Sequence, residues 1–350
     1  MRIIIFIFIL TIFYFNTTFS QETRIRKPID TIGFASKPGQ MDMFMSRVMN
    51  FSLSEADAPY KTVISPHDDY AYVGYVYPEL LSNIRANTII LFGVCHKAKL
   101  FNLENKIIFD TYTHWQMPYG NVKISSLRED IIANLPPDTY IIHDSIQALE
   151  HSVEAIVPFL QYNNRNVEII SILVPYMPYE KMNEIAEPLA KSIFSAVKKY
   201  NMNWGNEFAM VISSDAVHYG DEDWGGKNYA PFGADSVGYK KAIAYERDII
   251  TTCLIDKIEP NKINKFISFT VDENNYKEYK WTWCGRYSVP FGLFTSFYLQ
   301  KYFNCELIGE FVDYATSLDH PHVPVLDLGM GVTAPANIRH WVGYSAIGYK

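Results

Sequence analysis

Four stretches of this sequence place a histidine or a cysteine after a run of apolar residues. They are ISPH, which ends at His67, LFGVCH at His96, VISSDAVH at His218 and, after a helical segment, WTWC at Cys284. Imidazole nitrogens and a thiolate suit borderline divalent ions such as iron, copper or zinc. Three protein ligands leave coordination positions open, so these residue types favour a metal site at which a substrate or O₂ can bind.

His218 differs from the other two histidines because Asp215 precedes it by three residues. A carboxylate at this spacing can hold an imidazole in one tautomer. We therefore expect His218, supported by Asp215, to carry a proton in catalysis. We interpret His151 and Glu154 of the stretch EHSVE as structural or as support for the ligands, because H-x-x-E is not the H-E-x-x-H pattern of metalloproteases. The remaining histidines have no comparable context, and we expect them to be structural; they are His114, His143, His320, His322 and His340.

The elements that must position these side chains follow an α/β pattern. Apolar, β-rich runs at 88–94, 167–174 and 208–213 alternate with helical periodicity at 182–200 and 237–255, and a short strand is expected at 61–65. Continuous apolar runs are typical of strands that helices cover on both faces. Residues 306–314 and 340–349 alternate like strands, and 219–235 is the expected long loop. In parallel sheets the carboxyl ends of the strands share one edge, where ligands gather. The expected fold is one layered α/β/α domain around a mixed, largely parallel sheet.

The first twenty residues have the composition of a secretory signal peptide. They carry Arg2, an apolar run over residues 3–15 and small residues at Thr18 and Ser20. This run is shorter than the ~20 apolar residues of a spanning helix, and no later segment comes close. We expect cleavage after Ser20, a mature domain over 21–350, no integral span, and a periplasmic or extracellular location.

The chain has 350 residues, 48% hydrophobic, with a formal net charge of −7. This acidic balance, without a basic run of five residues, disfavours nucleic acid and anionic membrane surfaces as partners. Four cysteines (Cys95, Cys253, Cys284 and Cys305) are too few for a disulfide scaffold, although one bridge can form.

The sequence resembles the Memo family, which includes protein B of the AmmeMemoRadiSam system. The resemblance runs from about Ile32 to the C-terminus and rests on SPHDDYAYVG, GVCH, WQMPYGNV, EHSVEAIVPFLQY, ISSDAVHYG and CGRYSVPFG. It implies a fold like that of the class III extradiol ring-cleaving dioxygenases, which are non-haem iron enzymes. It also implies that His67, His96 and Cys284 bind a metal, most simply Fe²⁺, with copper or zinc as alternatives. In the dioxygenases a glutamate takes the place of this cysteine, and a histidine that matches His218 is the acid/base.

Three features depart from the family pattern. The usual PHAGY is PHDDY here, so Asp68 and Asp69 add negative charge beside His67. Cys95 replaces a small polar residue and offers an extra metal ligand or a disulfide partner for Cys284. The family is usually cytoplasmic, whereas this chain begins with an export signal.

Three functions follow from these observations. The first is an exported metal-binding protein with redox or dioxygenase-type activity on an unidentified small molecule. The second is a non-catalytic module that binds a ligand or peptide, because the animal members of the resembled family are described as binding phosphorylated peptides. The third is a metal-dependent hydrolase that uses His67, Asp68 and Asp69, which would need further carboxylates around a second ion at ~4 Å.

Overall fold

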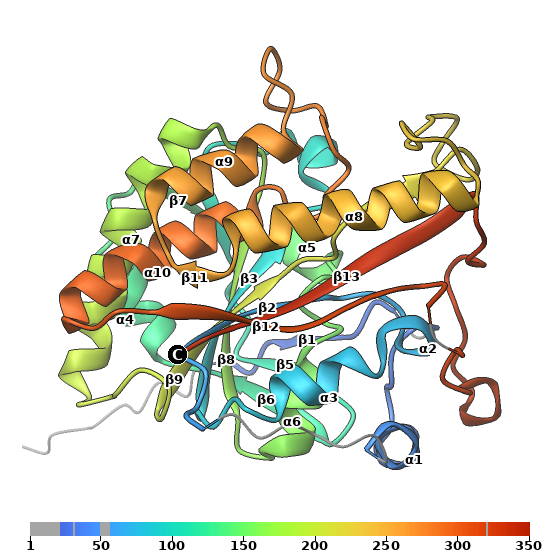
Figure 1. Cartoon of the computed structure of the whole chain (residues 1–350). Helices are drawn as coiled ribbons and strands as arrows, with labels where there is room; N and C mark the ends of the chain where they lie inside the picture. Colours follow the sequence, from blue (N-terminus) through green and yellow to red (C-terminus); the bar gives the residue numbers. More distant parts are fainter. Residues whose placement is uncertain (1–21, 31, 50–56, 320) are drawn as a thin grey trace, which may run out of the picture.

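The computed structural model describes residues 22–30, 32–49, 57–319 and 321–350 of the chain. The signal peptide expected at residues 1–20 lies outside these residues. The described part is an α/β fold in which helices cover both faces of one large sheet (Figure 1). The predicted fold class is therefore confirmed.

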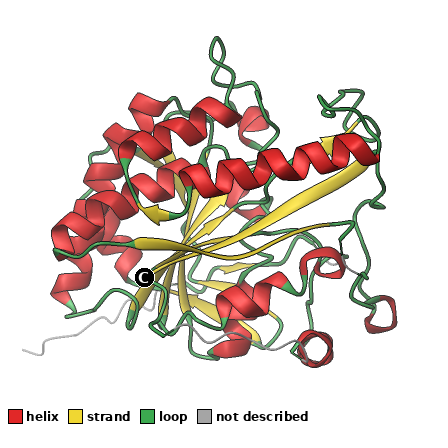
Figure 2. Cartoon of the chain, viewed as in Figure 1, coloured by secondary structure: helices red, strands yellow, loops and turns green. Residues whose placement is uncertain are grey.

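Thirteen strands of the described residues form the mixed sheet, and its central strands are parallel (Figure 2). The strands are β1 (Ile25–Arg26), β2 (Thr62–Ser65), β3 (Thr88–Val94), β4 (Ile107–Phe109), β5 (His114–Met117), β6 (Gly120–Ile124), β7 (Tyr140–Ile142), β8 (Glu168–Val174), β9 (Phe208–Ser213), β10 (His218–Gly220), β11 (Asp256–Lys257), β12 (Ile308–Thr316) and β13 (His340–Tyr349). The main path through the sheet is β1-β5-β6-β8-β3-β9-β2-β13-β12-β11.

The parallel centre of the sheet consists of β6, β8, β3, β9 and β2. The predicted strands 88–94 and 208–213 are β3 and β9, and every residue of both is buried. Successive side chains point to opposite faces, so Ile90 packs toward one helical layer while Ile89 and Leu91 pack toward the other. Both faces need apolar residues for this reason, which explains the continuous apolar runs.

Ten α-helices of the described residues flank the sheet. They are α1 (Pro38–Val48), α2 (Tyr70–Val73), α3 (Val76–Leu81), α4 (Leu127–Ala133), α5 (Asp144–Ala148), α6 (Val157–Asn163), α7 (Tyr179–Lys199), α8 (Ser236–Cys253), α9 (Pro260–Thr270) and α10 (Ser288–Phe303). Helices α4, α7, α8, α9 and α10 bury apolar residues against one face, and α1, α2, α3 and α6 against the other (Figure 1). Among the described helices, none has the length and apolar character to cross a membrane.

The C-terminal strands return to the sheet, as the alternation predicted. Strand β13 covers 340–349 and pairs antiparallel with β2, while β12 begins two residues later than expected and pairs antiparallel with β13. The predicted loop at 219–235 begins later, because β10 continues to Gly220 and pairs with β13. Strands β4 to β7 were not expected, since each has only three to five residues.

Candidate metal centre

Adjacent strand ends bring the predicted histidines together. Strands β3, β9 and β2 are neighbours in the sheet and run parallel, so their carboxyl ends meet at one edge. His67 follows β2 after Pro66, and His96 follows β3 after Cys95. The segment that carries Asp215 and His218 follows β9.

Cys284 arrives from a different part of the chain, between α9 and α10. Residues 281–284 lie against residues 216–218, with an antiparallel bridge between Val217 and Trp283. The backbone N–H of Cys284 donates to the carbonyl of Ala216 over 3.0 Å, and that of His218 donates to the carbonyl of Thr282 over 3.0 Å. This pairing sets the thiol at the same sheet edge as the histidines.

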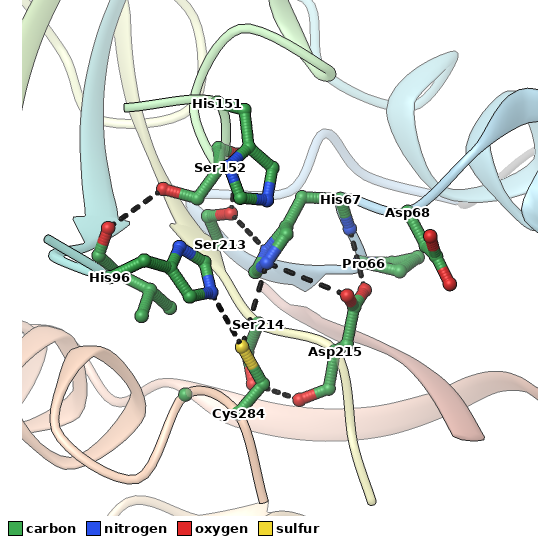
Figure 3. Close-up of polar contacts among 12 residues, drawn as sticks. Pro66, His67, Asp68, His96, His151, Ser152, Ser213, Ser214, Asp215 and Cys284 are labelled. Carbon is green, nitrogen blue, oxygen red and sulfur yellow. Dashed lines mark hydrogen bonds and ion pairs between the residues drawn. The ribbon is translucent and has the colours of Figure 1, made fainter. Parts of the chain in front are cut away.

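The three predicted ligands converge on a common point. Donor atoms of His67, His96 and Cys284 all lie within 4.8 Å of one another. The Sγ atom of Cys284 is 3.2 Å from Nε2 of His96 and 3.6 Å from Nε2 of His67, so the sulfur lies between the two rings (Figure 3). The three side chains therefore form a group that can receive one ion.

Each ligand histidine is oriented through its other ring nitrogen. Nδ1 of His96 lies 2.8 Å from the Glu150 carboxylate, and Nδ1 of His67 lies 2.8 Å from the Ser213 hydroxyl. Because that hydroxyl donates to the Ser152 carbonyl, His67 is the donor to Ser213. Both Nε2 atoms therefore keep a lone pair for a metal, an arrangement typical of metal-binding histidines.

Charge interactions favour a thiolate at Cys284. Burial alone raises the pKa of this thiol, but His96 and His67 hold it well below its ordinary value. Burial lowers the pKa of His96, whereas Glu150 and Cys284 raise it well above its ordinary value. Without an ion, the thiolate is therefore paired with a protonated imidazole, and a bound cation would replace that proton.

Asp215 supports His67 more directly than it supports His218. One Asp215 oxygen accepts the backbone N–H of His67 over 2.8 Å, and the other lies 3.4 Å from His67 Nε2 (Figure 3). The distance from Asp215 to His218 Nε2 is 3.9 Å, too long for a hydrogen bond. Burial lowers the pKa of His218, but Asp215 and Cys284 raise it to about 10. His218 is thus a proton donor at neutral pH, without the close carboxylate contact that the spacing predicted.

His67 and His96 line a cavity of about 580 Å³, which the sequence did not reveal, whereas Cys284 is buried and is not among its lining residues. Trp224 and His340 also line it, with their rings stacked 4.0 Å apart. His340, for which we expect a structural role, reaches this wall because β13 pairs with β10. Of the tyrosines after His67, Tyr72 lines the cavity, whereas Tyr70 and Tyr77 are fully buried in the core.

Glu150, His151 and Glu154 of the stretch EHSVE each make a different structural contact. Glu150 accepts from Nδ1 and the backbone N–H of His96, a role that the spacing had not indicated. The ring of His151 stacks on His96 with centroids 4.6 Å apart. Glu154 forms a buried ion pair with Arg26 and accepts the backbone N–H groups of Ile29 and Asp30, so it fastens the N-terminal segment beside the cavity.

The structure does not gather the donors of the hydrolase alternative. Asp68 accepts from the Tyr344 hydroxyl and points away from the three donor atoms (Figure 3), and Asp69 accepts from Thr333. Among the described residues, neither aspartate belongs to a group of metal-ligating atoms. Cys95 is buried, and it and Cys284 are both free thiols. His320 lies outside the described residues.

Comparison with known proteins adds evidence of a different kind. A family model described as "Memo-like protein" matches residues 33–324. A MEMO1 family protein of Saccharolobus solfataricus is 29% identical over 163 residues, which cover 45% of this chain and 52% of that protein. A MEMO1 family protein of Methanothermobacter thermautotrophicus is 28% identical over 168 residues, which cover 47% of this chain and 56% of that protein. The chain thus spans about half the length of these curated relatives.

Proposed function

Because the chain belongs to the Memo-like protein family, we propose that it is an exported protein that binds one iron or copper ion through His67, His96 and Cys284. The observation that carries the proposal is the convergence of two Nε2 atoms and one thiol within 4.8 Å. Imidazole and thiolate are borderline to soft donors, which suit iron, copper and zinc better than magnesium or calcium. We favour iron, with copper or zinc as competitors.

The surrounding residues fit such an ion. Glu150 and Ser213 fix the tautomers of the two histidines, which spares the ligands a rearrangement when the ion binds. The thiolate of Cys284 and the buried carboxylate of Asp215 supply negative charge to offset that of the cation. Three protein ligands leave positions open toward the cavity.

We further propose redox or extradiol-dioxygenase-type activity on a small molecule in this cavity. A bound iron or copper ion would supply one-electron and O₂ chemistry. His218 lines the same cavity, and its raised pKa makes it a proton donor toward a ligand there. The ring of Trp224 lies 5.3 Å from His218 and lines the same cavity.

The test is the metal content of the chain and of single-ligand variants. After anaerobic loading with Fe²⁺, elemental analysis should find one ion per chain, and His67→Ala, His96→Ala or Cys284→Ala should lower occupancy at least ~10-fold. Cys253→Ala, on a remote part of α8, is the matched control. Unchanged occupancy in Cys284→Ala would show that a different thiol is the ligand. Iron retention without oxygen uptake across a panel of catechols and phenols would favour the non-catalytic module.

A further inference from the structure

Two buried ring nitrogens of the cavity wall hydrogen-bond to no group among the described residues. They are Nε2 of His218 and Nε1 of Trp224, and both residues line the cavity. An oxygen of Asp215 lies 3.9 Å from Nε2 of His218, which is too far for a hydrogen bond. Buried indole N–H groups usually have an acceptor, and an unpaired one costs free energy. A ligand in the cavity can supply the acceptor that the protein lacks.

Other polar atoms of the wall do not offer such a contact. Trp341 also lines the cavity and has an unpartnered Nε1, but its ring packs against Tyr219 and against Tyr239 of α8, in the core. Several lining side chains already have partners within the protein, namely Asp68 with Tyr344, Asp69 with Thr333, and the Tyr72 hydroxyl, which donates to the Ala334 carbonyl. The indole N–H of Trp224 is therefore the donor that a ligand can use.

The ring of Trp224 is held in place before any ligand binds. It stacks on His340 with centroids 4.0 Å apart and an angle of 8° between the planes. The loop before it is fixed to the start of β13, because the backbone N–H groups of Asp221 and Glu222 donate to the Arg339 carbonyl over 3.0 and 3.2 Å. Nδ1 of His340 lies 3.0 Å from the Glu222 carbonyl. A donor oriented in this way loses little entropy when it binds a ligand.

The charges of the wall favour recognition by a hydrogen bond over recognition by charge. Five aspartates and five histidines line the cavity, together with Lys97. Neither acids nor potential cations dominate, so a charged ligand of either sign meets both. The ring of Trp224 is 5.3 Å from that of His218, so one small ligand can contact both rings.

We propose that Trp224 determines ligand specificity, by donating its indole N–H to an uncharged carbonyl oxygen on the side chain of a phenol. The cavity volume of about 580 Å³ is in the range for small-molecule sites. The inference rests on the proposed function for the other end of the ligand, because the phenol oxygen would lie toward the open metal positions and His218. The contact with Trp224 itself does not require the metal.

The test compares three phenols that differ only at the end of the side chain. 4-Hydroxyphenylacetone, 4-isobutylphenol and 4-hydroxyphenylacetate are titrated calorimetrically at neutral pH into Zn²⁺-loaded protein, because zinc does not turn the probes over. Trp224→Phe keeps an aromatic ring and removes the N–H, so the preference for the ketone over the alkyl phenol should fall ~3–10-fold. Tyr229→Phe is the matched control, since it removes a polar atom from the same loop but not from a lining residue, and it should keep the preference.

An unchanged preference in Trp224→Phe would overturn the inference, as would tighter binding of the carboxylate than of the ketone, or no binding of any probe. A second measurement needs only the unaltered protein, labelled with ¹⁵N. The ketone should move one of the indole N–H signals of the six tryptophans, relative to its position with the alkyl phenol. Identical indole signals with both probes would overturn the inference even if Trp224→Phe fails to fold.

Elemental analysis of the same samples measures the metal separately. Zinc retained without the effect of Trp224→Phe refutes only the inference about the ligand. The expected effect in protein that retains no zinc supports that inference and refutes the proposed metal function.

Discussion

Nδ1 of His96 lies 2.8 Å from Oε1 of Glu150, and Nε2 of the same ring lies 3.2 Å from Sγ of Cys284. One buried carboxylate therefore holds Nδ1 of His96 and leaves Nε2 as the ring nitrogen that a metal could bind. The same carboxylate accepts the backbone N–H groups of His96, His151 and Ser152, so its position is set by the loop that it supports.

Glu150→Gln should weaken metal binding by ~10–100-fold without removing a ligand. The amide loses the negative charge beside His96 and turns an NH₂ group toward backbone donors. Competition with a chromogenic chelator measures the dissociation constant. Glu180→Gln, at the exposed start of α7, should leave it unchanged. Equal metal dissociation constants for Glu150→Gln and Glu180→Gln would mean that Glu150 only supports the loop.

His218→Ala should keep its metal and lose ~10²–10⁴-fold in turnover, provided that a substrate is found. The residue lines the cavity as a proton donor and is not one of the three proposed ligands. Iron content and oxygen uptake are measured on the same preparation. An empty site in this variant would make His218 a ligand, in line with the second donor group formed by Asp215, His218 and Cys284.

Metal-free protein should contain a thiolate at Cys284 throughout pH 6–8, because His96 and His67 lower the pKa of this thiol. The ultraviolet absorbance of thiolate near ~240 nm should then be larger in the unaltered chain than in Cys284→Ser across this range. Burial raises the pKa of Cys95, so Cys95→Ser is the control and should not change the absorbance. A Cys284 signal that appears only above pH 8 would contradict the proposed charge pairing.

Glu246 should make the protein less stable as pH rises. Burial raises the pKa of this carboxyl from 4.5 to about 7, while it accepts from Trp281, Tyr314 and the backbone N–H of Val217. A raised pKa in the folded state means that stability is greatest below pH 4.5 and is lost as pH rises through 7, by up to about 3 kcal/mol.

Thermal unfolding of Glu246→Gln at pH 5 and pH 8 checks this expectation. The amide cannot ionise and accepts at only one atom, so the variant should be less stable than the unaltered chain at pH 5, with a gap that narrows or reverses at pH 8. Glu187→Gln, on the exposed face of α7, should follow the unaltered chain at both values. If the stability of Glu246→Gln changed with pH in parallel with that of the unaltered chain, the ionising group would be a different residue.

Protein recovered from outside the cytoplasm should begin at Gln21, because the short apolar run and the small residues Thr18 and Ser20 are typical of a cleaved signal. N-terminal sequencing of such protein measures this directly. Fractionation of cells that express the chain without residues 2–20 is the control, and this form should stay in the cytoplasm. An intact Met1 on exported protein would indicate a retained anchor.

The sequence by itself determined the parallel centre of the sheet and two of the residues at its edge. Strands β3 and β9 were predicted at their observed limits, because a strand covered on both faces must be apolar at every position. His67 and His96 were placed at strand ends by the same pattern, and parallel strands bring such ends to one edge. These features depend on the pattern of apolar residues along a single strand, which can be recognised from a few consecutive residues.

Only the tertiary structure decided how the site is completed. Cys284 is 188 residues from His96, and its position depends on the pairing of residues 281–284 with residues 216–218. Glu150 faces His96, Asp215 faces His67, and His340 stacks on Trp224, each across a long sequence separation. Contacts of this kind arise from the packing of loops and edge strands. Their short polar segments have no hydrophobic periodicity from which a contact partner could be predicted.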